Sequence, residues 1–142
     1  MSARGTGRRR TQRCGDREAR AKLRRAEQFL EVARMIVDEA DPDPDWVSAA
    51  AALAVLAGIS ASDAACCKAL GVRSRGQDHH DAEALLEQID PGGKNAANAL
   101  RRLVTLKDEA HYGSSGMSKR SAVPAFTQAE KLVAFGREVL AR

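Results

Sequence analysis

The residue types best suited to chemistry come together in the segment from Leu100 to Gly113. Lys107 and His111 are four residues apart, and in a helix this spacing puts both side chains on one face. A histidine with a pKa of about 6.5 can act as a general acid or base, while a cation beside it stabilises charge on a phosphate. Tyr112 adds a hydroxyl donor. These residues predict a phosphate-handling site; the alternative is that His111 only caps its own helix end, where the helix dipole favours a cation.

A carboxylate and a polar loop are candidates to complete this site. Asp63 falls on an apolar helical row, where its carboxylate must be paired, hydrogen-bonded or near water. It either bonds a neighbouring helix end or orients a histidine across the bundle. Basic and imidazole side chains that are candidates for nucleic-acid contacts are Arg75, His79, His80 and Arg102. Adjacent histidines cannot usually point at one ion, so we predict no metal site, and no motif for a cofactor is found.

Helices are needed to position these residues, and hydrophobic periodicity predicts where they lie. Apolar stripes at helical spacing predict long helices at 16–40, 46–70, 94–112 and 119–141, and a short one at 78–89. The 46–70 segment is apolar nearly all round and rich in small residues, which predicts a central helix that neighbours approach closely. Expected N-caps are Asp16, Asp45, Asp78 and a serine between Ser118 and Ser121. The predicted fold is therefore all-α: an up-and-down bundle of four long helices plus one short helix.

Charge divides the chain into two parts. Residues 1–25 hold ten Lys or Arg against two acids, a net charge of +8, whereas residues 26–142 have a net charge of −4. Residues 1–15 lack hydrophobic periodicity, so we expect a basic disordered arm followed by one helical domain at 16–142. The arm either pairs with nucleic-acid phosphates or is a solubilising tail or unused upstream coding sequence.

Hydropathy and the lack of a signal-peptide pattern favour a soluble, cytoplasmic chain, and cysteine usage favours free thiols. The three cysteines are Cys14, Cys66 and Cys67, and the side chains of the adjacent pair diverge by about 100° on a helix. We therefore expect reduced, mostly buried thiols and no disulfide framework. No signal-peptide pattern and no charge-free apolar run of 18 residues is found, so no membrane partner is predicted.

The pattern of helices and the run Lys-Asp-Glu-Ala-His-Tyr-Gly resemble a HEPN domain (higher eukaryotes and prokaryotes nucleotide-binding). The segment Ala-Gly-Ile-Ser-Ala-Ser-Asp-Ala-Ala and the loop Arg-Gly-Gln-Asp-His-His contribute to this resemblance, which spans roughly 17–141. The family's catalytic signature is an Arg, four to six residues and a His near the end of a late helix. Here Arg102 precedes His111 with eight residues between them and Lys107 with three, so Lys107 stands only approximately for that Arg.

The resemblance implies a helical bundle, usually dimeric, from toxin–antitoxin, defence or RNA-processing systems. It also implies RNA or a nucleotide as ligand, and a nucleotidyltransferase-type or other operon partner. Three functions stay open at this point. The first is a non-enzymatic protein that binds RNA or nucleotide at a groove between two copies of the chain. The second is a metal-independent endoribonuclease that uses His111 with Lys107, and the third is nucleic-acid binding through the basic arm.

Overall fold

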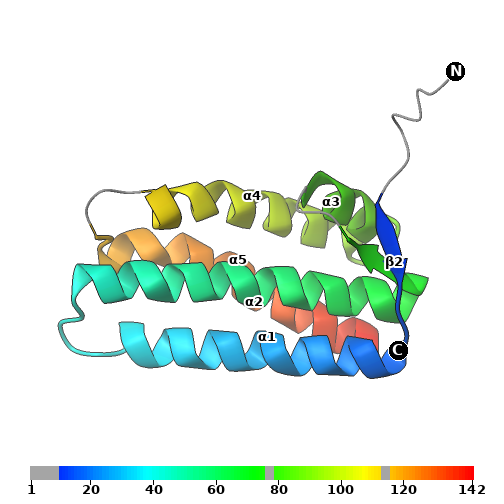
Figure 1. The fold of residues 1–142 in the computed structure, drawn as a ribbon, viewed down its shortest axis with the longest axis horizontal. Coiled ribbons are helices and arrows are strands. Elements are labelled where there is room, and N and C mark those ends of the chain that lie inside the picture. Colours follow the sequence, from blue (N-terminus) through cyan, green and yellow to red (C-terminus); the bar gives the residue numbers. More distant parts are fainter. Residues whose placement is uncertain (1–9, 76–78, 113–115) are drawn as a thin grey trace, which may run out of the picture.

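The computed structural model describes residues 10–75, 79–112 and 116–142, and for residues 108–112 it describes the helical backbone only. Its described elements, in chain order, are β2 (Thr11–Arg13), α1 (Asp16–Val37), α2 (Pro44–Leu70), β3 (Val72–Ser74), α3 (His79–Glu87), α4 (Gly93–Tyr112) and α5 (Lys119–Leu140). The four long helices lie side by side along one axis, and the short α3 packs near the start of α4 (Figure 1). The predicted all-α bundle of four long helices and one short one is confirmed.

Helix α2 is central, as its composition predicts. It packs against α1, α4 and α5, and most of its residues are buried. Gly58 allows the closest approach, because a Cβ atom there would meet Leu103 of α4 and lie 3.0 Å from the Leu132 side chain of α5. Small residues therefore let three helices converge on the middle of α2.

The helix ends follow local capping chemistry, with small shifts from the expected residues. Gly15 takes the N-cap position of α1, so Asp16 is the first helical residue and not the cap. Asp43, two residues before the expected Asp45, caps α2 by accepting a hydrogen bond from the Asp45 amide. Ser118 caps α5 through the Ser121 amide. The expected cap of α3, Asp78, lies outside the described residues.

The expectation that residues 1–15 lack regular structure is wrong for their last part. Strand β2 pairs antiparallel with β3, with Gln12 opposite Arg73. The Cys14 amide then donates to the Gly71 carbonyl, which continues the pairing up to the start of α1. Residues 10–15 therefore belong to the folded domain, and residues 1–9 lie outside the described part of the chain.

Candidate functional site

Lys107 lies on the second turn from the end of α4, on a row that changes from core to surface. Leu100 is fully buried, Val104 is partly buried, and Lys107 is also partly exposed. His111 and Tyr112 continue the backbone of the same helix, and their side chains lie outside the described residues. The predicted Lys107–His111 pair therefore rests on helical spacing, with only its first member described in full.

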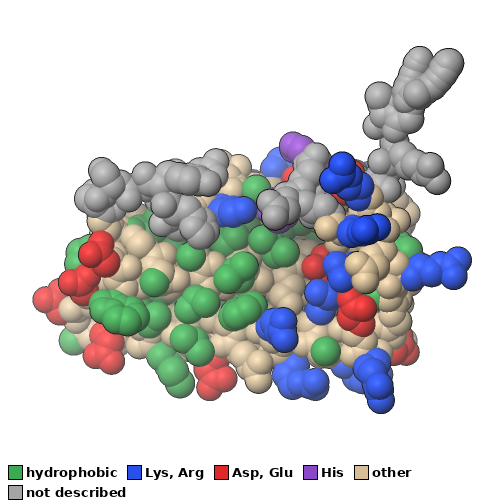
Figure 2. Space-filling view, in the orientation of Figure 1, with side chains coloured by type: hydrophobic (Ala, Val, Ile, Leu, Met, Phe, Trp, Pro, Cys, Tyr) green, Lys and Arg blue, Asp and Glu red, His purple; other side chains and the backbone are tan. Residues whose placement is uncertain are grey.

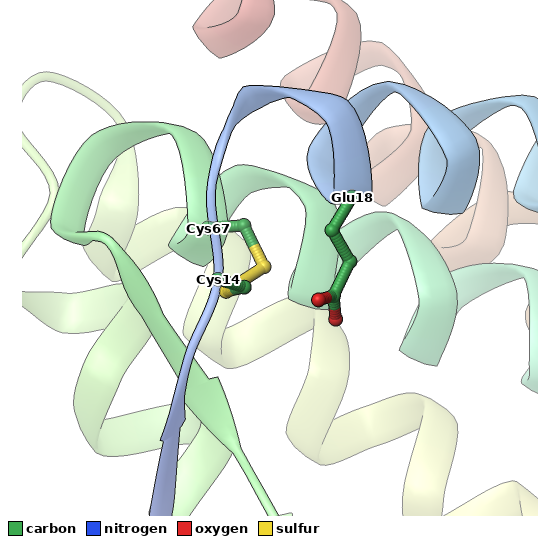
Figure 3. A group of neighbouring side chains, drawn as sticks. All are labelled: Cys14, Glu18 and Cys67. Atoms are coloured by element: carbon green, nitrogen blue, oxygen red, sulfur yellow. A yellow bond between two sulfur atoms is a disulfide. The ribbon is translucent and has the colours of Figure 1, made fainter.

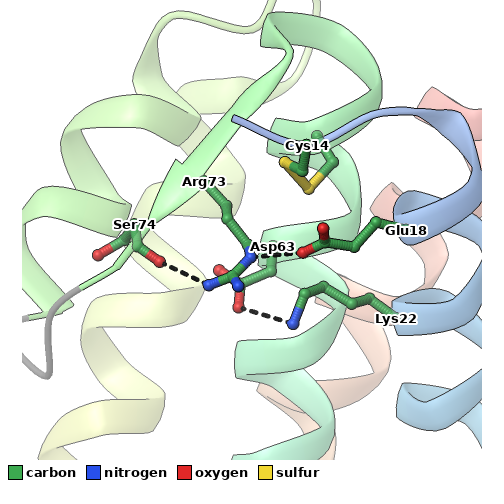
Figure 4. Close-up of a disulfide and its surroundings, with 7 residues drawn as sticks. Cys14, Glu18, Lys22, Asp63, Arg73 and Ser74 are labelled. Carbon is green, nitrogen blue, oxygen red and sulfur yellow. Dashed lines mark hydrogen bonds and ion pairs between the residues drawn. A yellow bond between two sulfur atoms is a disulfide. The ribbon is translucent and has the colours of Figure 1, made fainter. Parts of the chain in front are cut away.

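Asp63 belongs to a charged cluster on the side of α2 that faces α1, whereas Lys107 lies on α4. Its carboxylate lies 3.8 Å from the Lys22 ammonium of α1, and the neighbouring Glu18 accepts a hydrogen bond of 2.6 Å from the Arg73 guanidinium of β3 (Figure 4). Burial raises the pKa of Asp63 to about 6, although the nearby Lys22 and Arg73 act in the opposite direction. The carboxylate is thus partly protonated near neutral pH and is held by α1 and not by α4.

The two predicted catalytic positions are far apart along the bundle. Leu103 contacts Gly58, and α4 runs antiparallel to α2. Asp63 is five residues from Gly58 towards one end of the bundle, and Lys107 is four residues from Leu103 towards the other end. The two residues are therefore about 13 Å apart along the bundle axis. His111 is a further turn away. Within one copy, Asp63 is held by Lys22 and lies away from the end of α4 that carries His111. Because the His111 side chain lies outside the described residues, its orientation by Asp63 stays a prediction.

The predicted nucleic-acid contacts divide between two places. Buried Glu83 of α3 accepts a hydrogen bond of 2.9 Å from Arg101 of α4 and lies 3.6 Å from the His80 ring. His79 begins the same short helix, and Arg75 follows β3, where its amide donates to the Arg10 carbonyl. Lys107 is six residues beyond Arg101, about 9 Å further along α4.

Arg102 lies on a different surface from these residues. It lines an open groove of about 520 Å³ between α4 and α5, together with the second cation Lys131. The groove also holds the side-chain amides of Asn95, Asn98 and Gln128. Of the eight predicted site residues, six have described side chains, and the structure does not gather these six into one pocket.

A disulfide joins Cys14 to Cys67, which corrects the expectation of reduced thiols (Figure 3). Strand pairing brings Cys14 against the end of α2, where Cys67 is buried. The carboxylate of Glu18 lies within 4.8 Å of both sulfur atoms, but sulfurs bonded to each other are not thiolate ligands for a metal. Cys66 faces the core as a free thiol, and burial raises its pKa to about 12. The sequence carried no signal for this bridge, because it depends on the β2–β3 pairing.

Helix α2 also has an uncovered apolar side, which we call the α2 face; its residues are Ala49, Ala52, Leu53, Leu56 and Ile59. Leu56 is 46% exposed at its middle, and exposed Val32, Met35 and Trp46 extend the apolar surface on the side of α1. Figure 2 shows hydrophobic side chains gathered from the middle to the lower left of this face, with acidic side chains at the left end and many Lys and Arg at the right. Such a patch on a small domain marks an interaction surface.

The same helix is long and apolar enough to cross a membrane by length and composition alone. The mean hydropathy of its most apolar window is 1.7, and 67% of that window is buried inside the bundle. A central helix of a bundle has this character, because it packs against neighbours on most sides. The α2 face is the part of it that the described chain leaves uncovered.

No protein-family model matches this chain, and a search of curated proteins also finds no match. The HEPN resemblance therefore stays a hypothesis that rests on the helical pattern and the quoted motifs.

Proposed function

We propose that this chain is a HEPN-like helical protein that forms a homodimer through the α2 face and binds RNA or a nucleotide in the groove where two copies meet. The observation that carries the proposal is the exposed apolar side of α2 around Leu56, on a helix that is otherwise core. The context of a toxin–antitoxin, defence or RNA-processing system rests on the resemblance alone. A second copy supplies what the face lacks, which is an apolar cover of the same size and shape.

The charges beside the α2 face favour one arrangement of two copies. The acidic end holds Glu39, Asp41 and Asp43, and the basic end holds the exposed arginines at the start of α1, which are Arg17, Arg20, Arg24 and Arg25. Two copies bring identical faces together about a two-fold axis that lies in the plane of the interface. This axis can run parallel or perpendicular to the helices. The axis parallel to the helices sets like charges against each other, whereas the perpendicular axis sets the acidic end of each copy against the basic end of the other. Charge complementarity therefore selects the perpendicular axis.

A hollow at the acidic end supports this choice. It has a volume of about 380 Å³ and is lined by three carboxylates and the Trp46 ring, among others. Carboxylates and an aromatic face are the two partners that a guanidinium prefers. An arginine from the basic end of the second copy fits this chemistry, and the exposure of Trp46, 62%, leaves its ring open to such a contact.

The perpendicular axis also brings the two copies of Lys107 to one edge of the interface. Because Leu103 meets Gly58, Lys107 is level with Ala54, which is about 3 Å along the axis from Leu56. A two-fold axis through Leu56 therefore keeps both Lys107 side chains at nearly the same level and on the same edge. Two lysines at one groove provide cations that bind a phosphate backbone.

The dimer is tested by light scattering on the purified chain and on Leu56→Glu. We expect a dimer for the wild type and a monomer for the variant, because a carboxylate would be buried without a partner. Val123→Glu is the matched control, since Val123 is 55% exposed on α5, which lies behind α2. A wild-type monomer at high micromolar concentration contradicts the proposal.

The arrangement is tested by charge reversal. Arg20→Glu with Arg24→Glu should weaken the dimer, and adding Glu39→Lys with Asp41→Lys to the same chain should restore it. Restoration is expected only if opposite ends meet. A quadruple variant that associates no better than the double variant contradicts the perpendicular axis.

Ligand binding is tested by fluorescence anisotropy with a labelled single-stranded RNA over a range of salt concentrations. Lys107→Gln should weaken binding and lower the salt slope, because each chain loses one phosphate contact. Lys94→Gln, an exposed position at the other end of α4, is the control. A chain without residues 1–9 separates the groove from the basic arm: if affinity disappears with the arm and not with Lys107, the arm is the binding element.

A further inference from the structure

The groove between α4 and α5 has charged side chains that are unevenly distributed along its length. It is separate from the α2 face. Arg102 lies at one end and Lys131 lies between it and the other end, and neither makes an ion pair within the described part of the chain. At the other end, Phe135 packs against Gly92, and Glu138 is paired with Arg142 at 3.4 Å. The free positive charge is therefore concentrated at Arg102 and Lys131.

The floor of the groove contains the side-chain amide of Gln128, whose polar atoms open to the groove. Gln128 is only 8% exposed, yet no hydrogen bond of its side chain is found among the described residues. None of its polar atoms is fully buried and unsatisfied, so the amide opens to the groove. The amide is therefore placed to hydrogen-bond a polar ligand that lies in the groove.

The remaining lining suits a polar molecule with a flat or compact body. Asn98 accepts a hydrogen bond of 2.7 Å from Arg101 through its side-chain oxygen, which leaves its amide N–H groups as donors. Asn95 is exposed one turn earlier, and the walls between are small or apolar: Ala96, Ala99, Ala134 and Phe135. The volume of about 520 Å³ is within the usual range for small-molecule sites.

We infer that the α4–α5 groove binds a phosphate monoester, with the phosphate over Gln128 between Arg102 and Lys131 and the polar body towards Asn98 and Asn95. Two cations match a dianion, and the amides match hydroxyl or ring nitrogen groups. A nucleoside monophosphate and a sugar phosphate share this chemistry. The site is separate from the dimer groove, so Leu56→Glu leaves its affinity unchanged.

The test is a titration of the isotope-labelled full chain followed by two-dimensional NMR, with the Gln128 side-chain amide as the direct reporter. The probes are AMP, ribose 5-phosphate, inorganic phosphate and adenosine. AMP or ribose 5-phosphate should shift the Gln128 amide and bind more tightly than inorganic phosphate or adenosine, since each of those lacks one half of the ligand. Tighter binding of AMP than of ribose 5-phosphate assigns the site to nucleotides, and the reverse or equal binding assigns it to sugar phosphates.

Variants then distinguish specific binding in the groove from non-specific attraction of the phosphate to surface cations. Gln128→Leu, Arg102→Gln and Lys131→Gln should each weaken the preferred ester by about 10- to 100-fold, the usual effect of losing a hydrogen bond to a charged group. Arg120→Gln, an exposed position on the same α5, is the control and should bind as the wild type does. No shift of the Gln128 amide at millimolar ester, or equal loss in the control, overturns the inference. Adenosine binding as tightly as AMP overturns it too.

Discussion

Leu103 of α4 occupies the space beside Gly58 of α2 that any larger residue at position 58 would need. This contact fixes the distance between the two helices and, with it, the level of Lys107 on the bundle. Leu132 of α5 lies 3.0 Å from the same point, so there is little room for Leu103 to move.

We therefore expect Gly58→Val to destabilise the fold by about 1–3 kcal/mol, because overpacking forces the neighbouring leucines off their preferred rotamers. Ala69→Val is the control, since Ala69 is exposed on the same helix and tests the helix propensity of valine alone. Urea unfolding followed by circular dichroism measures both. Equal stability of the two variants would show that the α2–α4 contact is looser than its geometry indicates.

The pKa of Asp63, raised to about 6 by burial, predicts a pH-dependent stability. The folded chain binds the Asp63 proton more tightly than the unfolded chain, so stability from this group is full below about pH 4 and falls as pH rises to about 6. The difference in free energy of unfolding between wild type and Asp63→Asn should change by up to about 3 kcal/mol across this window. Lys22→Gln removes the closest cation, 3.8 Å away, and should extend the window upwards. Parallel pH profiles for wild type and Asp63→Asn would refute the shift.

The bridge between Cys14 and Cys67 should contribute about 2–4 kcal/mol to stability, because it closes a long loop whose ends have a sequence separation of 53. Cys14→Ser should lose this amount, and a reducing agent should lower the stability of the wild type but not of the variant. Alkylation followed by mass spectrometry reports on the thiols: Cys66, with its raised pKa and buried position, should react only after unfolding. Ready alkylation of Cys14 in the untreated, folded wild type would mean that the bridge is not formed.

The nuclease alternative has its own measurement, which is cleavage of mixed cellular RNA in EDTA. We expect wild type and His111→Ala to show the same background, because Lys107 lacks the two-pronged phosphate contact of an arginine. Cleavage by the wild type that falls about 10²- to 10⁴-fold in His111→Ala would instead assign acid–base catalysis to this residue. If the wild type cleaves RNA, Lys107→Arg should increase the cleavage rate, because an arginine restores the two-pronged phosphate contact.

Apolar periodicity predicts the helices of this chain well, because each long helix buries one continuous stripe. The stripe of α1 and the small residues of α2 are sufficient to define a central helix and its neighbours. What periodicity does not contain is the rotation of one helix relative to the next. Asp63 therefore lies on the predicted row but faces Lys22 of α1 instead of the helix that carries Lys107.

The N-terminal strand shows a second limit of sequence reasoning. Residues 11–13 are polar and charged, and all three are exposed, so no hydrophobic pattern distinguishes them from a disordered arm. Their order comes from backbone pairing with Val72–Ser74 and from the covalent bond at Cys14, both of which join segments far apart in the sequence. The cytoplasmic location rests on hydropathy and on the lack of a signal-peptide pattern, and it stays a prediction. Lasting disulfides are rare in that compartment.

The bond between Cys14 and Cys67 makes a covalent ring that contains all of α1 and most of α2. The connection between these helices, residues 38–43, is mostly exposed and rich in acidic residues, which makes it the part of the ring most open to a protease that cuts after acidic residues. A single cut there opens the ring without dividing the chain. The nicked protein should migrate as one band on a denaturing gel and separate into two fragments only after reduction.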